Sequence, residues 1–279
     1  MEEQRNKKEL IWTIVVTTVV AILHHEAAKA IGKVVTDTYL QAFLGELFFA
    51  ILTLAAVIAF KKMAIFKSDT ELLKKGWTSA GILFVLILYY LYIGTGAIQK
   101  ATASFPQVML FLGHCFLIGF CEEVLFRGLV QRAFHRAFKE DCFVHIFLAL
   151  LCSGAVFGIV HLTNADLSVS ILSIVYMSLS NIFAGMFYGA VYFRTGKNLW
   201  YNVILHGIYD AVGLILYGRL SGAPLNAVVS PSVSMQSFVR QTLTYAALYL
   251  LPTLIILRTK KLEPLLAERK DERCQGYFS

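Results

Sequence analysis

Residues 107–137 read QVMLFLGHCFLIGFCEEVLFRGLVQRAFHRA, an apolar stretch that two acids and a base interrupt near its middle. The acids are Glu122 and Glu123, and the base is Arg127. The stretch exceeds the ~20 residues that cross a bilayer, so its end should project into the cytosol. A charge at bilayer depth costs at least ~2.5 kcal/mol on insertion scales, so it needs a partner and usually has a function. The stretch therefore predicts a membrane helix that carries a polar site.

The composition of the whole chain is that of a membrane protein. Of its 279 residues, 57% are hydrophobic and 15% are charged, and the mean hydropathy is +0.65. Soluble domains average about 25% charged residues. The net charge of +7 does not indicate nucleic-acid binding, because the basic residues lie between apolar runs, where they set membrane topology. We therefore expect the lipid bilayer as a partner and no nucleic acid.

The pattern of apolar runs predicts an all-α polytopic bundle of about eight transmembrane helices. Lys and Arg concentrate at the amino terminus, in alternate connections and in the tail, which places both termini in the cytosol of a multi-pass cell-membrane protein. The expected runs are residues 10–31, 40–60, 79–99, 107–137, 143–162, 168–193, 198–217 and 236–257.

Three regions follow from this pattern. Residues 1–105 should hold the first three transmembrane helices and a short amphipathic cytosolic segment at 68–76. Residues 106–217 should hold the polar core on helices four to seven. Residues 218–279 should hold the last transmembrane helix and a cytosolic tail.

Two further patterns place polar side chains inside later apolar runs: Phe157-x-x-x-His161 and His206-x-x-x-Asp210. Asn202 lies four residues before His206, and side chains three or four residues apart share a helix face. Asn202, His206 and Asp210 should therefore form one stripe on the seventh helix.

The two adjacent acids should have different partners. Neighbouring residues on a helix are about 100° apart, so Glu122 and Glu123 cannot point the same way. Glu123 can pair with Arg127, which lies four residues later. Glu122 is left for another group, and Gly119, one turn earlier, would leave room for a water or a peptide.

His161 is the expected partner of Glu122. The turn between the fourth and fifth runs lies near Asp141 and Cys142, with Glu122 19 residues before Asp141 and His161 19 residues after Cys142. An antiparallel hairpin would bring the two side chains to the same height, with Phe157 packed along the same seam. A carboxylate and a neutral imidazole that share a water can hold and deprotonate it.

The seventh run would supply the rest of the site. Amide hydrolysis also needs groups that stabilise the developing oxyanion, and His206 is the candidate on the facing helix. His206 lies ~12 Å from the cytosolic start of its run, which places the site in the cytosolic half of the membrane, open to the inner face.

The segments EEVLFRG, FGIVHL and NLWYNVILHGIYD occur in this order on successive apolar runs. They resemble the three motifs of the CPBP family of intramembrane proteases (CAAX protease and bacteriocin-processing, or Abi), which includes type II CAAX prenyl endopeptidases. The resemblance covers about residues 106–217 and implies eight helices with a glutamate-activated water.

The resemblance also implies roles for individual residues. Glu122 would be the base and His161 its partner, and His206 and Asp210 would bind the oxyanion. The supporting residues would be Glu123, Arg127, Phe157 and Asn202.

Asp210 departs from the family, which often has Asn at that position. Ionised Asp accepts hydrogen bonds and donates none. Asp210 is therefore protonated, or orients His206, or leaves the oxyanion to His206 alone. We expect no cofactor. The alternative is zinc held by Glu122, His161, His206 and Asp210, although the chain has no HExxH motif.

Other polar residues in the apolar runs have simpler interpretations. Glu46 should be paired inside the bundle or near the outer interface. His114, eight residues before Glu122, should be a hydrogen-bonded core histidine. His24 and His25 should lie near a membrane surface.

The sequence thus predicts an intramembrane endopeptidase that acts on a membrane-bound or lipidated peptide near the cytosolic leaflet. Prenyl-CaaX removal and leader-peptide or bacteriocin processing both remain open as reactions. Two other classes are alternatives: a proton-coupled transporter, since buried acids and histidines also form proton relays, and a non-catalytic immunity or scaffold protein.

Overall fold

The computed structural model describes residues 2–67, 79–138, 142–164, 170–222 and 234–258. Within these ranges the regular structure is helical throughout, which confirms the expected all-α membrane bundle. The amphipathic segment predicted at 68–76 and most of the predicted tail lie outside the described residues.

The long helices form one bundle with short 3₁₀ and π segments between or within them. Their order along the chain is α1 (Glu2–Val34), α2 (Thr38–Ala59), η1 (Met63–Phe66), α4 (Gly81–Ile93), α5 (Thr95–Gln99), α6 (Phe105–Glu122), η2 (Glu123–Gln131), α7 (Arg132–Phe138), α8 (Phe143–Val160), η3 (His161–Asn164), α9 (Ile171–Arg194), α10 (Leu199–Leu216), η4 (Arg219–Ser221), α11 (Met235–Tyr245), η6 (Ala246–Leu250) and α12 (Leu251–Leu257).

Six of the described helical segments are long and apolar enough to cross a membrane: α1, α2, the continuous α6–α7 segment, α8 with its 3₁₀ end, α9 and α10. The apolar α4 is shorter, and the last predicted run is divided into α11, η6 and α12. Large apolar side chains such as Val85, Leu88 and Ile58 face outward, whereas Glu123 and Arg127 are fully buried. This inside-out distribution suits a lipid surround, where exposed polar groups are costly.

Local sequence signals account for where several of these helices begin. Asp37 caps α2, because its carboxylate accepts hydrogen bonds from the backbone N–H groups of Tyr39 and Leu40. Ser104 caps α6 with Pro106 in its first turn, a favoured position for proline. These hydrogen bonds satisfy donors that the helix itself leaves unpaired.

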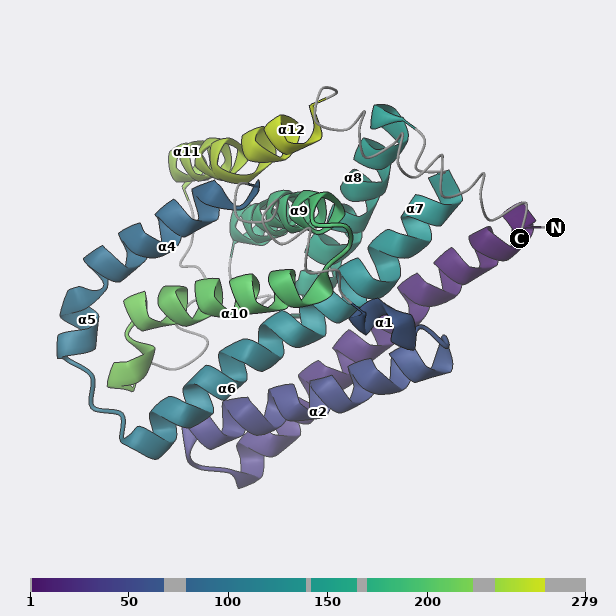
Figure 1. Ribbon diagram of the computed structural model, residues 1–279. Helices are drawn as coiled ribbons and strands as arrows, with labels where there is room; N and C mark the ends of the chain where they lie inside the picture. The colour runs from purple at the N-terminus through teal and green to yellow at the C-terminus, as the bar shows by residue number, and fades with distance from the viewer. Residues whose placement is uncertain (1, 68–78, 139–141, 165–169, 223–233, 259–279) are drawn as a thin grey trace.

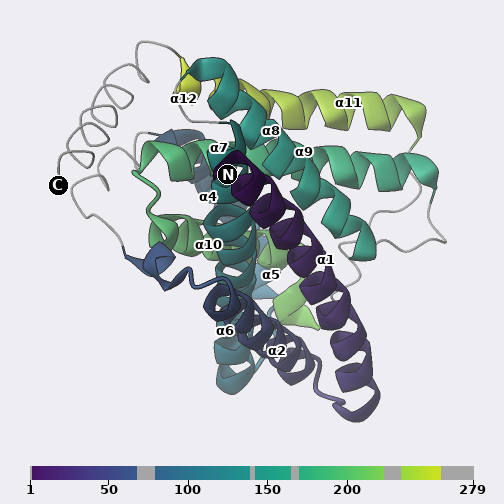
Figure 2. The same ribbon diagram turned by 90° about the vertical axis from the view of Figure 1, so that its right-hand side faces the viewer.

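Helix α6 lies at the centre of the arrangement. It packs between α2 on one side and α10 on the other, and α1 lies against α2 (Figures 1 and 2). Helices α8 and α9 form a second closely packed pair, with α11 and α12 lying along α9 (Figures 1 and 2). The three predicted motifs, on α6–η2, α8–η3 and α10, are therefore carried by helices that meet in the interior.

Glycines set the closest approach between α6 and α10. A Cβ atom at Gly119 would lie 2.6 Å from the Val203 carbonyl oxygen and 2.9 Å from the Gly207 nitrogen. The expectation that Gly119 leaves room for a water or a peptide is wrong, because the backbone of α10 fills that space. Gly119 thus places α10 against α6, which brings the third motif to the first.

The predicted fourth helix changes its hydrogen-bonding pattern at the motif itself. Residues Glu123–Gln131 form a π-helical segment between the α-helical segments α6 and α7. Single π turns are rare and occur often at functional sites. Here the segment begins directly after Glu122, so the change of winding falls between the two adjacent acids.

Candidate active site

Glu122 and His161 lie together, as the hairpin argument predicts. Glu122 ends α6, and His161 follows the last residue of α8. The distance from Glu122 Oε1 to His161 Nε2 is 3.5 Å. The structure therefore brings a carboxylate and an imidazole from two neighbouring helices to one point in the bundle.

The hydrogen bonding of His161 fixes which of its nitrogens faces Glu122. His161 Nδ1 lies 2.8 Å from the Phe157 carbonyl oxygen, and a carbonyl can only accept, so Nδ1 carries a proton. In the neutral ring, Nε2 is then an acceptor that faces the acceptor oxygen of Glu122. Two acceptors 3.5 Å apart are satisfied by a molecule that donates to both, and a water has the two O–H bonds to do so.

His206 contacts both acids, which the sequence did not predict. Its Nδ1 lies 2.8 Å from Glu123 Oε1, and its Nε2 lies 3.6 Å from Glu122 Oε2. Glu122 and Glu123 point in different directions, yet the imidazole from α10 lies between them. His206 therefore connects the two acids.

Glu123 is held in a buried polar network. Its Oε2 lies 3.2 Å from Arg127 Nε, so the predicted pair is present. Asn202 donates from Nδ2 to Glu123 Oε2 at 3.0 Å and to the Tyr188 carbonyl at 2.8 Å. The Arg127 guanidinium lies over the Phe157 ring, 4.7 Å from its centroid. Glu123 and Arg127 are thus committed to each other and to neighbouring helices.

The exposed fraction of the side chain differs between the groups that face the interior space of the site and the groups that hold them in place. The side chains of Glu123 and Arg127 are 0% and 1% exposed. Glu122 and His161 are 17% and 19% exposed, and Asp210 is 21% exposed. The partly exposed groups can reach a substrate, whereas the buried pair cannot.

Asp210 and Tyr188 complete the wall of the site. Asp210 Oδ2 lies 3.5 Å from His206 Nε2 and has no hydrogen-bond partner among the described residues. The Tyr188 ring stacks on the His206 ring, with centroids 4.6 Å apart, and its hydroxyl is likewise unpartnered within the described part of the chain. The sequence analysis did not identify Tyr188, which lies on α9 outside the three motifs.

Two cavities meet at these groups. The polar cavity, of about 530 Å³, lies among α1, α2, α6 and α8. The tyrosine cavity, of about 380 Å³, includes Tyr90, Tyr188, Tyr209, Tyr245 and Tyr249 in its wall. The residues that line both cavities are Ile118, Glu122, His161 and Leu214. A chain that extends from one cavity into the other must therefore pass Glu122 and His161.

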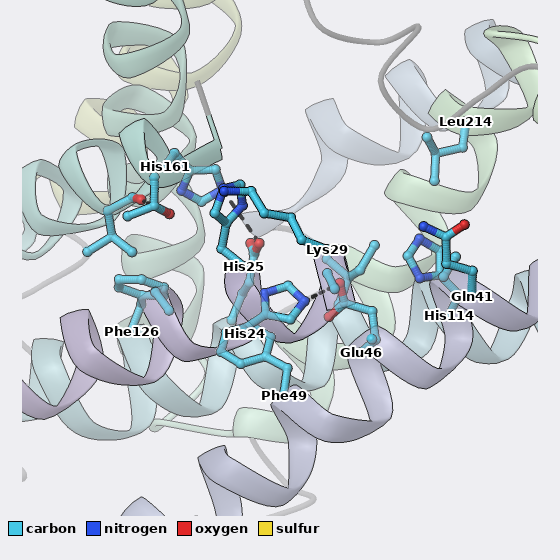
Figure 3. Close-up of a pocket in the computed structure, with 18 residues that line it drawn as sticks. His24, His25, Lys29, Gln41, Glu46, Phe49, His114, Phe126, His161 and Leu214 are labelled. Atoms are coloured by element: carbon cyan, nitrogen blue, oxygen red, sulfur yellow. Dashed lines mark hydrogen bonds and ion pairs between the residues drawn. The ribbon is translucent and has the colours of Figure 1, made fainter. Parts of the chain in front are cut away.

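The polar cavity extends along the bundle, from Glu122 and His161 to Gln41 and His114. Figure 3 shows His161 and Phe126 on one side and His114 and Gln41 on the other. Its lining residues run toward the start of α6, the start of α2 and the end of α1. In the topology that the sequence predicts, with the amino terminus in the cytosol, this direction leads away from the inner face, to which the site was expected to open.

The side chains proposed as zinc ligands do not converge as metal ligands do. In the ranges that the structure describes, no group of three or more His, Cys, Asp or Glu side chains is arranged to hold a metal ion. Zinc binding requires ligand atoms at about 2.0–2.2 Å from one point. We therefore derive no step through a metal.

The polar cavity bears on two further expectations. The Nε2 atom of His24 lies 3.2 Å from Glu46 Oε1 inside the cavity, so Glu46 is paired as expected. His114 is buried as expected, with the backbone of Ala42 near its ring. Neither ring nitrogen has the full geometry of a hydrogen bond to a described residue.

Comparison with known families fits this geometry. Residues 104–212 match the family model described as type II CAAX prenyl endopeptidase Rce1-like. This segment of the chain is therefore similar to the CAAX protease family. The matched segment contains all three motifs and hence Glu122, His161, His206 and Asp210. No curated protein matches the chain.

Proposed function

We propose that this protein is an intramembrane endopeptidase of the CAAX protease family in which Glu122 and His161 activate a water. The observation that carries the proposal is the approach of Glu122 Oε1 to His161 Nε2 at 3.5 Å, at the boundary of two cavities. Family membership supports proteolysis as the class of reaction. The roles of the individual residues rest on their geometry.

The first step is the attack of the water. The water donates one hydrogen bond to Glu122 and one to His161 Nε2. Glu122 takes the proton as general base while the water oxygen bonds to the scissile carbonyl carbon, a type of step that contributes about 10²–10⁴-fold to rate. The Phe157 carbonyl keeps the proton on His161 Nδ1, so Nε2 stays directed at the water.

The second requirement is stabilisation of the oxyanion. His206 Nδ1 is committed to Glu123, so its Nε2 is the atom that faces the site, and it donates there as an imidazolium. The Tyr188 hydroxyl is a second donor beside His206. Preorganised donors of this kind typically contribute ~10²–10³-fold each.

The last step breaks the C–N bond. The tetrahedral intermediate collapses to a carboxylic acid, and the proton that Glu122 accepted passes to the leaving amine. Glu123, Arg127 and Asn202 take no part in the transfer and instead hold His206 in place. Asp210 lies beside His206 Nε2 and orients it.

The substrate we propose is a membrane-bound or lipidated peptide. The site lies inside a multi-pass bundle, so the peptide must reach it within the membrane. His206 is seven residues past the start of α10, or ~10 Å along the helix. The basic residues Arg194 and Lys197 lie just before the start of α10. We place both termini in the cytosol, and this end of α10 and the site in the cytosolic half of the cell membrane.

The test compares purified wild type with Glu122→Gln and His161→Ala in proteoliposomes. The probes are an S-farnesylated peptide with a CaaX end and an unprenylated leader-type membrane peptide, each followed by mass spectrometry. We expect cleavage of one probe by wild type and a loss of about 10³-fold in Glu122→Gln. His145→Gln is the matched control, because His145 lines neither cavity.

Other outcomes would assign the chain to another class. Full activity in either variant would contradict the proposed base. Proton-coupled flux without any cleavage would support a transporter, and a stability loss in Glu122→Gln with no cleavable peptide would support a scaffold.

A further inference from the structure

The last helical run of the bundle is held unevenly along its length. Its final part, α12, buries Thr253, Ile256 and Leu257, and the π segment η6 buries Tyr249. Helix α11 has no buried residue, and Leu243 on it is 65% exposed. Local opening is easiest where few side chains are buried. Helix α11 is therefore the part of this run that can leave the bundle at the lowest cost.

The run contains a place to bend between its loosely and its firmly held parts. Residues Ala246–Leu250 form the π-helical segment η6, and Pro252 lies in the first turn of α12. Proline donates no backbone hydrogen bond, and sharp bends in helices concentrate at prolines and π turns. Helices α11 and α12 both lie along α9, on the outside of the bundle (Figures 1 and 2). A bend at Pro252 would move α11 and η6 while α12 stays packed.

Two contacts between tyrosines hold the movable part against its neighbours. The Tyr249 hydroxyl donates to the Tyr209 hydroxyl at 2.6 Å, which joins η6 to α10. The Tyr245 ring meets the Tyr176 ring edge to face, with centroids 5.7 Å apart, which joins α11 to α9. A hydrogen bond of this kind shifts an equilibrium by about two- to tenfold. The contacts therefore favour the closed arrangement without locking it.

The movable part covers one of the two cavities that meet at the candidate site. Tyr245 and Tyr249 belong to the wall of the tyrosine cavity, as do Glu122 and His161. Tyr217 lines the same cavity and is 56% exposed, so the wall reaches the surface of the bundle. An outward movement of α11 and η6 would therefore widen a path from this surface to Glu122.

We propose that α11 and η6 form a lateral gate, which bends outward at Pro252 and opens the tyrosine cavity to the bilayer. The two tyrosine contacts are its latch. A membrane-bound peptide passes the open gate and reaches Glu122 without leaving the membrane. This inference rests on the proposed function, because it takes Glu122 as the place of cleavage.

A reversible bridge between α11 and α9 tests the gate. The protein is the full chain with Tyr176→Cys and Tyr245→Cys, reconstituted in proteoliposomes and bridged by a bismaleimide whose spacer contains a disulfide. Mass spectrometry of the linked peptides verifies the bridge. The controls are the two single variants treated with the same reagent and the double variant treated with N-ethylmaleimide. These controls carry reagent in the same place but do not join the helices.

The gate predicts that only the bridge slows cleavage. We expect the bridged protein to lose about tenfold or more in kcat/KM for the membrane peptide of the preceding assay, because closure blocks entry. Cutting the spacer with a reductant should restore the value of the N-ethylmaleimide control. A bridged protein as fast as its controls would overturn the gate, and so would a loss that the reductant does not reverse.

The latch has a separate test that needs no substrate. The reporter is Thr242→Cys on α11, where the native hydroxyl oxygen is buried, and its labelling by N-ethylmaleimide is followed by mass spectrometry. We expect labelling about two- to tenfold faster with Tyr209→Phe than with the control Tyr92→Phe, which alters an exposed tyrosine on α4. The same comparison with Thr253→Cys, on α12, should show no difference. Equal rates for the Thr242→Cys reporter would overturn the latch.

The gate and the proposed function fail in different ways. If wild type cleaves no membrane peptide, the proposed function fails, while the labelling rates still report on the movement of α11. If wild type cleaves and depends on Glu122 but the bridge does not slow it, only the gate fails.

Discussion

The bundle contains two clusters of glutamate and histidine that differ in how completely their glutamate and histidine side chains are paired. Around Glu123, the carboxylate oxygens meet His206, Arg127 and Asn202 at 2.8–3.2 Å. In the polar cavity, His24 and Glu46 are paired, but His114 has no hydrogen-bond partner among the described residues. The first cluster joins η2 to α10, and the second lines an open cavity.

The comparison distinguishes two kinds of buried polar side chain in this membrane protein: those that hold other residues in place and those that border a cavity. The Glu123 carboxylate is paired at both oxygens, positions His206 and so stabilises the geometry of the site. His114, by contrast, has the Ala42 backbone near its ring and borders the open polar cavity. Glu122 lies between these extremes, because it touches His161 and His206 at 3.5 and 3.6 Å and still faces both cavities.

The largest contrast should appear in stability. Arg127→Met leaves Glu123 buried without its cation, which should cost about 3–5 kcal/mol and lower the thermal unfolding temperature in detergent. His114→Leu removes an unpaired polar group and should be neutral or slightly stabilising. Equal losses in the two variants would show that the clusters do not differ as described.

The contact between α6 and α10 gives a smaller effect. A Cβ at Gly119 would meet the backbone of Val203 and Gly207, so Gly119→Ala should cost about 1–3 kcal/mol and slow cleavage by displacing His206. Gly213→Ala, where a Cβ would meet nothing within 4 Å, is the matched control on α10. Thermal unfolding and kcat measure both effects. A Gly119→Ala protein as stable and active as the control would contradict the close packing.

The smallest expected effect is at Asp210. Asp210→Asn restores a hydrogen-bond donor beside His206 Nε2, so cleavage should be retained or raised by a few-fold, with a chelator having no effect. Elemental analysis of both proteins provides the control. A rate lost together with bound metal would show that the four side chains are zinc ligands instead.

The sequence predicted the parts of this picture that depend on spacing within a helix or across one turn. Hydropathy gave the all-α membrane bundle, and the count of 19 residues on each side of the turn brought Glu122 to His161. The pair of Glu123 and Arg127 followed from a separation of four residues. These relations need no knowledge of how distant helices pack.

The relations that the sequence did not predict all depend on packing between helices distant in the chain. From the sequence, Gly119 predicts free space beside the helix, whereas in the structure the backbone of α10 occupies that space. The π-helical winding after Glu122 and the place of His206 between the two acids have no signature in residue spacing. From the sequence, His114 is a core residue, and only the packing of α1 and α2 shows that a cavity lies beside it.

The central claim is that Glu122 and His161 act as one unit on a shared water. Its most direct test is a kinetic cycle of Glu122→Gln, His161→Ala and the double variant, measured as kcat for the cleaved membrane peptide. Residues that act as a unit are strongly non-additive, so the double variant should be about as slow as the slower single variant. A double variant slowed by the product of the two single effects would contradict the account.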